Sequence, residues 1–84
     1  MKRHVLWSGD AERDLLAIPW TDAAWISAQV ARYAEHGIGD VRRTSLPSGQ
    51  IVPILFLPGY RVAFAYDRTA RTLWVRWVWR IAPR

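Results

Sequence analysis

Cysteine is absent from the 84-residue sequence, so the fold can contain neither a disulfide bond nor a thiolate zinc site. Histidine is also scarce, because only His4 and His36 are present and they lie far apart in the chain. Together these absences predict a protein that binds no metal and uses no cofactor. A chain without cysteine also fits a reducing compartment.

Long hydrophobic runs are missing as well. No stretch approaches the roughly 18 to 20 apolar residues of a membrane-spanning helix, and the apolar stretch after the basic residues 2–4 is too short for a signal peptide. These absences predict a soluble, cytoplasmic protein with no membrane partner. A chain of this length has room for one domain, residues 1–84, around one core.

Familiar catalytic motifs are also missing. The sequence contains no GxGxxG, Walker, GxSxG or HExxH pattern. His4 near the N-terminus and His36 at a predicted helix end are poor candidates for proton transfer. Arginine is too weak an acid and base for that role at neutral pH, so any catalysis would depend on electrostatic stabilisation and substrate distortion.

Acidic residues almost disappear after residue 40. Residues 1–40 carry four basic and six acidic side chains, whereas residues 41–84 carry eight arginines and one acidic residue, Asp67. The net charge of +5 therefore comes from the second half. Guanidinium groups stay charged at physiological pH and bind phosphate or carboxylate through two parallel hydrogen bonds. This half of the chain predicts a polyanionic partner.

Two helices are predicted in the first half. The first covers residues 11–18, begins after Asp10 and ends at Pro19. The second is capped by Thr21 and runs to about residue 36, where Gly37 can end it in a left-handed conformation. Each helix carries an apolar stripe, so we expect the two to pack together as an αα-hairpin.

Strands are predicted at the N-terminus and throughout the second half, where the hydrophobic period changes to two. Their ranges are 4–8, 41–46, 50–57, 60–67 and 72–81. The pattern predicts an α+β fold. In it, the short N-terminal strand and the helical hairpin pack on one face of a twisted, mainly antiparallel sheet of four or five strands.

The last two strands also predict a register, because only one pairing keeps a whole face apolar. That register sets Tyr66 opposite Leu73, Phe64 opposite Val75 and Val62 opposite Trp77. The helical hairpin is expected to cover this face, and Trp77 and Trp79 are assigned to the core beneath it.

The opposite face is predicted to stay open to solvent. Arginines and an apolar, aromatic floor share it: Arg42, Arg61, Arg76 and Arg80, with Val52, Ile54, Phe56 and Trp74. The small Ala63 and Ala65 at its centre predict a shallow hollow. Arginines set among aromatic rings are the combination that binds single-stranded nucleic acid.

Arg42, Arg76 and Trp74 are therefore expected to contact RNA, with Trp74 as the stacking group. The alternative is that these arginines are ordinary solvated side chains lying over an apolar floor. A single arginine fits that role well, whereas four on one face favour a binding surface.

The order and spacing of these segments resemble the RelE/ParE-superfamily toxins of bacterial type II toxin–antitoxin systems. The similarity rests on the opening of the first helix at residues 11–15, on Gly59-Tyr60-Arg61-Val62, on the Tyr66-Asp67 turn and on a last strand that closes at Arg80. In nuclease-type relatives these two arginines sit in the mRNA site. The resemblance thus implies catalytic roles for Arg61 and Arg80.

The chain also departs from the nuclease-type pattern. Such relatives often place Lys or Glu where this chain has Val52, Ile54 and Phe56, and many have a Tyr shortly after the final Arg. The usual proton-transfer groups are therefore missing from their expected positions.

Three functions follow from the resemblance. The first is an mRNA interferase, an endoribonuclease that enters the ribosomal A site, cleaves translated mRNA and so inhibits translation. The second is a ParE-like, non-catalytic inhibitor of DNA gyrase, which the apolar Val52, Ile54 and Phe56 favour slightly. The third is a degenerate member that only binds its antitoxin. All three imply a cognate antitoxin protein, and the same three apolar residues are its expected contacts.

Overall fold

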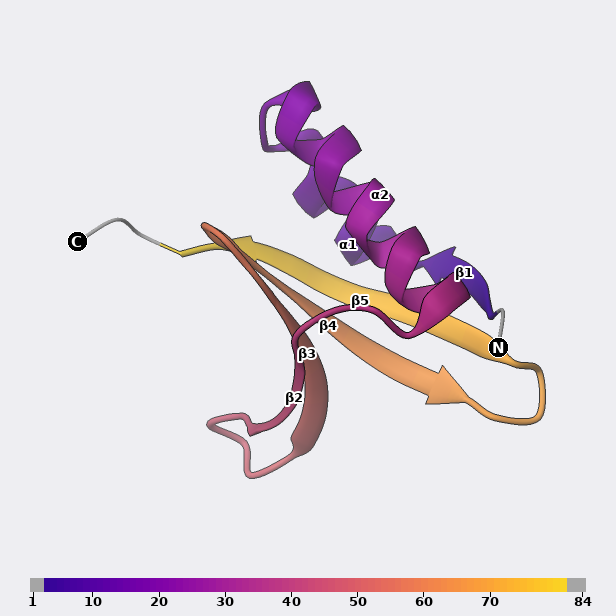
Figure 1. Cartoon of the computed structure of the whole chain (residues 1–84). Coiled ribbons are helices and arrows are strands. Elements are labelled where there is room, and N and C mark those ends of the chain that lie inside the picture. Colours follow the sequence, from indigo (N-terminus) through magenta and orange to yellow (C-terminus); the bar gives the residue numbers. More distant parts are fainter. Residues whose placement is uncertain (1–2, 82–84) are drawn as a thin grey trace.

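The computed structural model describes residues 3–81, which form two helices and a five-stranded sheet (Figure 1). In chain order the elements are β1 (His4–Trp7), α1 (Gly9–Leu16), α2 (Trp20–His36), β2 (Val41–Ser45), β3 (Ile51–Leu57), β4 (Tyr60–Asp67) and β5 (Thr72–Arg80). Within this described part, no helix has both the length and the apolar character needed to cross a membrane.

The strands are ordered β1-β5-β4-β3-β2 across the sheet. β1 runs parallel to β5, and every other neighbouring pair is antiparallel. Figure 1 shows α2 lying along one side of the sheet, with α1 behind it and β1 beside β5. The predicted α+β architecture, with a helical hairpin on one face of a mainly antiparallel sheet, is confirmed.

Both helices begin earlier than the sequence suggested. Ser8, rather than Asp10, caps α1, because its Oγ accepts a hydrogen bond at 3.0 Å from a backbone N–H of the first turn. α2 begins directly after Pro19 rather than after Thr21, and no side chain caps it. Gly37 ends α2 with a φ of 68°, the left-handed conformation expected of it.

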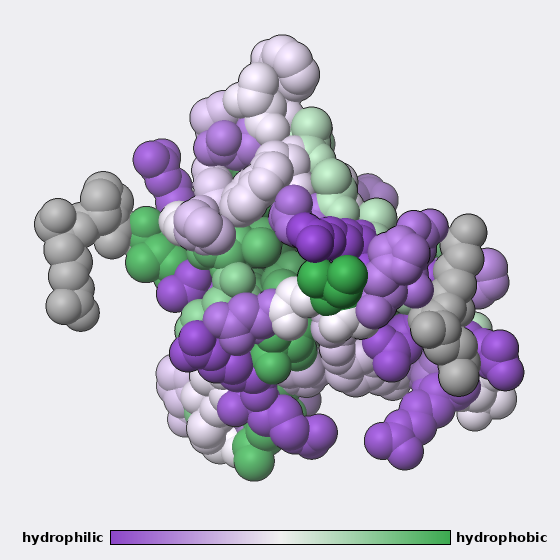
Figure 2. All heavy atoms as spheres, viewed as in Figure 1, coloured by the Kyte–Doolittle hydropathy of each residue, from purple (hydrophilic) through white to green (hydrophobic). Residues whose placement is uncertain are grey.

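The core fills the space between the helices and the sheet. Both layers contribute fully buried side chains, including Ala11, Ile26, Val30, Phe64, Leu73 and Val75. The Phe64 ring stacks on Tyr33 of α2, with ring centroids 5.6 Å apart and planes 4° from parallel. In Figure 2, hydrophobic side chains are visible between the helices at the top and the strands below, which mostly show hydrophilic residues.

The predicted β4–β5 register holds at one end of the hairpin and fails at the other. The observed pairs are Tyr66 with Leu73, Phe64 with Val75, Ala63 with Trp77 and Val62 with Val78. A β-bulge causes the difference, because β5 contains one extra residue, Arg76, between the partners of Phe64 and Ala63. The predicted pairing of Val62 with Trp77 is therefore wrong.

The bulge exchanges the two faces of β5 beyond Arg76. Val78 turns toward the helices and is 4% exposed. Trp77 and Trp79 turn to the face away from the helices, where they pair with Ala63 and Arg61. Their assignment to the core beneath the helices is therefore wrong as well.

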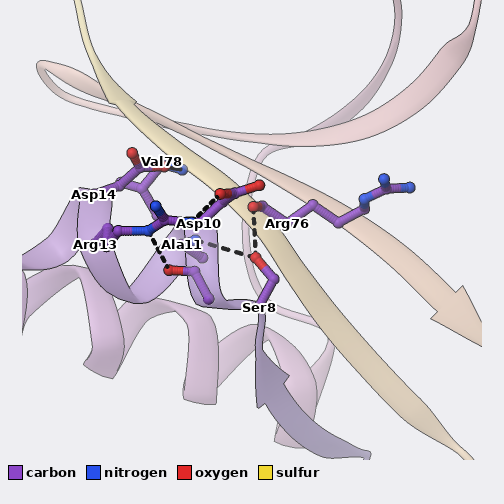
Figure 3. Close-up of polar contacts among 8 residues, drawn as sticks. Ser8, Asp10, Ala11, Arg13, Asp14, Arg76 and Val78 are labelled. Carbon is purple, nitrogen blue, oxygen red and sulfur yellow. Dashed lines mark hydrogen bonds and ion pairs between the residues drawn. The ribbon is translucent and has the colours of Figure 1, made fainter.

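Beyond the end of β1, side chains of α1 and of its N-cap residue supply hydrogen-bond partners for the backbone of β5 (Figure 3). Parallel pairing ends at Val75. Beyond it, the Ser8 hydroxyl donates to the carbonyl oxygen of Arg76 at 2.7 Å, and the N–H of Val78 donates to the Asp14 carboxylate at 2.9 Å. The Arg76 side chain itself points away from α1. Backbone groups around the bulge thus find partners without a further strand.

Removing either of these two partners should destabilise the fold measurably. We expect Ser8→Ala and Asp14→Ala each to lower the free energy of unfolding by about 1–3 kcal/mol, because each leaves a polar backbone group of β5 without its partner. Urea unfolding at fixed pH measures the change. Ser45→Ala, on an exposed strand position, is the control, and an unchanged midpoint in both α1 variants would contradict the assigned role.

A second, smaller hydrophobic cluster lies on the face of the sheet away from the helices. Its members are Val52, Ile54 and Ala63, at 4%, 3% and 1% exposure, packed against Leu46, Phe56 and Trp77. The expected hollow at Ala63 is therefore filled, because the bulge brings Trp77 over it. Val52 and Ile54 are buried too, so the expectation that they form an exposed patch is wrong.

Candidate functional site

The face of the sheet away from the helices, called here the open face, carries the candidate site. Its outward side chains come from all four strands of the second half: Arg42, Phe56, Arg61, Trp74, Arg76, Trp77 and Trp79. Three of the four predicted arginines are brought together on this face. The fourth, Arg80, is not.

Arg61 is held in a fixed position at the start of β4. Its Nη1 donates to the carbonyl oxygens of Leu57 and Tyr60, at 2.9 and 2.8 Å, and its guanidinium carbon lies 4.2 Å from the centroid of the Phe56 ring. Within residues 3–81, no carboxylate forms an ion pair with Arg61. Nε and Nη2 therefore remain able to donate to an anion.

Arg42 also lies against the Phe56 ring, but it forms an ion pair with Asp40. Its guanidinium carbon is 4.4 Å from the Phe56 centroid, while Nε and Nη2 donate to the two carboxylate oxygens of Asp40 at 3.0 and 2.8 Å. This hydrogen bonding holds the pKa of Asp40 below its usual value, and the charge of Arg61 adds to the effect. The Asp40 carboxylate thus stays ionised and offsets one of the two guanidinium charges.

Tryptophans extend the open face along β5. Trp74 and Trp79 are 40% and 37% exposed, and Trp77 is partly buried in the second cluster. The Arg76 guanidinium carbon lies 4.8 Å from the centroid of the Trp77 ring, a cation–π contact. The predicted stacking residue Trp74 is therefore accessible, and Trp79 adds a second accessible ring.

Arg80 lies on the face covered by the helices, so the expectation that it shares a face with Arg61 is wrong. It pairs across the strands with Tyr60, whose side chain belongs to the helix-side core, while Arg61 pairs with Trp79. The single-residue bulge upstream in β5 explains the change of face. The Tyr60 hydroxyl donates to Asp22 at 2.7 Å, which raises the pKa of Tyr60, and the nearby charge of Arg80 opposes this.

This arrangement can bind a phosphate through Arg61 and stack flat rings on exposed indoles. Proton transfer is harder, because the lowered pKa makes the Asp40 carboxylate a weak base. Asp67, expected at the rim of the face, lies at the opposite end of β4 from Arg61, and its Oδ1 accepts a hydrogen bond from Ala70 at 3.0 Å. The arrangement therefore favours electrostatic stabilisation of an anion over proton transfer.

Two residues of the site escaped sequence reasoning. Asp40 lies two positions before Arg42, and this spacing places side chains on the same side of extended chain, so the signal was present. Trp79 was hidden by the bulge, for which the sequence gives no separate signal.

Comparison with known proteins gives matches in structure alone. No protein-family model and no curated protein matches the sequence. The toxin–antitoxin complex RelBE2 of Mycobacterium tuberculosis contains a chain with a TM-score of 0.84 and 15% identity, covering 99% of this chain and 95% of that one.

Two further complexes contain similar chains. The archaeal RelE–RelB complex of Pyrococcus horikoshii matches with a TM-score of 0.74 and 12% identity, over 95% of this chain and 96% of that one. The intact RelBE complex of Escherichia coli matches with a TM-score of 0.61 and 12% identity, over 96% and 99%. The chain therefore has the RelE fold over its whole described length, and the resemblance noted in the sequence is confirmed at the level of the fold.

Proposed function

We propose that this chain is the toxin of a type II toxin–antitoxin system and that it arrests growth by cleaving mRNA on the ribosome. The RelE fold supports the first part. The observation that carries the second is Arg61, a fixed guanidinium with free donors on an open face lined with aromatic rings.

In the proposed reaction, the 2′-hydroxyl oxygen of one nucleotide attacks the adjacent phosphate of the mRNA, and the bond from phosphorus to the 5′-oxygen of the next nucleotide breaks. Water accepts the hydroxyl proton and protonates the departing 5′-oxygen, so the products are a 2′,3′-cyclic phosphate and a free 5′-hydroxyl. During the attack, negative charge builds up on the oxygens of the pentavalent phosphate. Nε and Nη2 of Arg61 donate to these oxygens, and because Nη1 is already held by two carbonyls, little reorganisation is needed during the reaction.

Arg80 is proposed to supply a second guanidinium from the edge of the sheet. It is the cross-strand partner of Tyr60, the residue that precedes Arg61, so both arginines lie at the same end of the hairpin. A long exposed side chain at that end can approach the scissile phosphate around the edge rather than across the open face.

The remaining open-face residues are proposed to hold the RNA on either side of the scissile bond. Arg42 and Arg76 would contact phosphates, and Trp74 would stack on a base, with Trp79 beside Arg61 as a further platform. Asp40 would orient Arg42 through its two hydrogen bonds rather than accept a proton.

An antitoxin is the second proposed partner, since the structural relatives are toxin–antitoxin complexes. A groove of about 430 Å³ between α1 and α2 offers an apolar docking surface, with Leu16 and Trp20 at 86% and 80% exposure. Phe56 is partly accessible, whereas docking on Val52 and Ile54 would require the second cluster to open. A role for these three residues in antitoxin binding stays a prediction.

A translation extract tests the proposal directly. Purified protein is added to an extract that translates a defined mRNA, and primer extension maps any new 5′ ends. Cleavage within translated codons, and none on the same mRNA without ribosomes, is the expected result. Translation arrest with intact mRNA would contradict it. Inhibition of gyrase supercoiling would point to the alternative target, although the burial of Val52 and Ile54 removes the observation that favoured it.

A further inference from the structure

A second cluster of arginines lies away from the open face, around a cavity of about 430 Å³. It gathers residues from four segments of the chain, and its lining includes Arg3, Arg43, Tyr66, Arg68, Arg71 and Thr72. The volume is within the range of small-molecule sites in proteins, about 300–1,000 Å³. Figure 1 shows the β4–β5 loop and the start of β1 at the same end of the sheet. The cavity lies at this end, because its lining includes Arg3, just before β1, and Arg68 and Arg71 of the loop.

The cavity carries a concentrated positive charge that its lining residues offset only in part, because four arginines face one carboxylate. Within residues 3–81, none of its four arginines forms an ion pair. Its single carboxylate, Asp67, is hydrogen-bonded to the backbone of the β4–β5 loop. Four unpaired guanidinium groups around one small space repel one another, so an anion bound between them would relieve that repulsion.

The loop geometry gives an independent observation. Arg71 has a φ of 51°, and it is the one residue other than glycine with a positive φ among those described. Glycine or asparagine is usual in this conformation, and an arginine here costs conformational energy. Arg71 also lines the cavity, so the strained backbone position lies in the cavity wall.

Tyr66 adds a neutral donor to the cavity wall. Its hydroxyl lies 2.5 Å from the hydroxyl of Tyr33, so one hydrogen is shared between the two oxygens. When Tyr33 donates, the hydrogen of Tyr66 is free to point into the cavity. Burial and this hydrogen bond raise the pKa of Tyr66, so the phenol keeps its proton at physiological pH.

We propose that this cavity binds a phosphomonoester, the dianionic phosphate of a nucleotide-sized ligand. Four guanidiniums and one carboxylate leave a local charge near +3, which matches a dianion better than the single charge of a phosphodiester. A free nucleotide and the 5′-phosphorylated end of an RNA offer the same group. The site does not depend on the proposed nuclease activity.

The cavity lies far from Arg61 and on the opposite side of the sheet. Tyr66 follows Arg61 by five positions along β4, a separation of about 17 Å at the usual rise of a strand. Tyr66 also pairs with the buried Leu73, on the side of the sheet that the helices cover. A ligand in the cavity therefore leaves the open face accessible.

Titration of the isotope-labelled, 84-residue chain tests this site. Uridine 5′-monophosphate, a 5′-phosphorylated RNA oligonucleotide, the same oligonucleotide without the phosphate, and uridine are added in turn at physiological ionic strength. The amide signals of Tyr66, Arg71 and Thr72 should shift with the two phosphomonoesters and not with uridine. Comparing the nucleotide with the phosphorylated oligonucleotide shows which source binds more tightly.

Arg71→Gly is the decisive variant, because glycine accepts the positive φ and the fold should persist. We expect it to weaken binding of uridine 5′-monophosphate about tenfold, the usual effect of losing one charge-assisted hydrogen bond. Arg32→Gln, on the exposed side of α2, is the charge-matched control. The proposal would be overturned by unchanged affinity for uridine 5′-monophosphate in Arg71→Gly. It would also be overturned if uridine or the unphosphorylated oligonucleotide shifted the Tyr66, Arg71 and Thr72 amide signals as strongly as the phosphomonoesters do.

Discussion

Arg61→Ala is expected to lower the rate of mRNA cleavage by about two to three orders of magnitude, the usual cost of removing one fixed donor to a developing negative charge. The large effect follows from how the side chain is held. Two carbonyl oxygens and the Phe56 ring fix the guanidinium before substrate arrives, and no carboxylate among the described residues competes for it. Single-turnover cleavage of a ribosome-bound mRNA measures the rate.

Two further variants separate charge from geometry. Arg61→Lys keeps the charge but loses the planar fork, so an intermediate rate is expected. Arg32→Ala removes one positive charge from an exposed position of α2 and should leave the rate unchanged. Since Arg61 also holds two carbonyls of the β3–β4 turn, urea unfolding of each variant checks that the fold persists. Cleavage by a folded Arg61→Ala protein at the wild-type rate would remove Arg61 from the mechanism.

Phe64→Ala is expected to lower the free energy of unfolding by about 3–5 kcal/mol. The side chain is 1% exposed in the middle of the sheet and stacks on Tyr33, so its removal opens a cavity between the two layers. Small domains are stable by only about 5–15 kcal/mol, so this single change should remove a large part of the total. Chemical denaturation followed by tryptophan fluorescence measures it.

A matched control comes from an apolar residue outside the core. Leu16 is 86% exposed, and Leu16→Ala should change stability by less than about 0.5 kcal/mol. If Phe64→Ala lowered the free energy of unfolding as little as Leu16→Ala, the helices would have to move to fill the space. The contact between α2 and the sheet would then be looser than the stacking of Phe64 on Tyr33 indicates.

Local patterns in the sequence were enough to predict the architecture. The apolar stripes of the two helices, Gly37 as the end of α2, and the pairs at the loop end of the last hairpin all follow from spacing and turn chemistry. These features depend on residues close together in the chain, where one period or one turn decides the geometry.

The other end of that hairpin could not be predicted, because a bulge inserts Arg76 without leaving a mark in the alternation of side chains. Beyond Arg76, each side chain of β5 points to the face opposite the predicted one. Arg80 therefore lies on the helix side of the sheet, and Trp79 lies on the open face. The bulge is stabilised by Ser8 and Asp14, more than sixty residues away in the sequence. A contact of this kind depends on the whole fold rather than on the strand itself.

The arginine-lined cavity was out of reach for a related reason. Arg3, Arg43 and Arg71 belong to segments that meet only when the sheet is complete, and the sequence indicated no more than a turn near Asp67. Charge counts showed that the second half was basic. They could not show that some of its arginines lie on the open face and others around the cavity.

β1 lies at one edge of the described sheet, where it pairs with β5. During synthesis of the chain, β1 has no neighbour until β5 leaves the ribosomal exit tunnel, and until then Ser8 and Asp14 lack the backbone groups that they bind. The sheet is therefore completed only once β5 has emerged. Until that point a nascent chain would also lack part of the open face, because Trp74, Arg76 and Trp79 belong to β5.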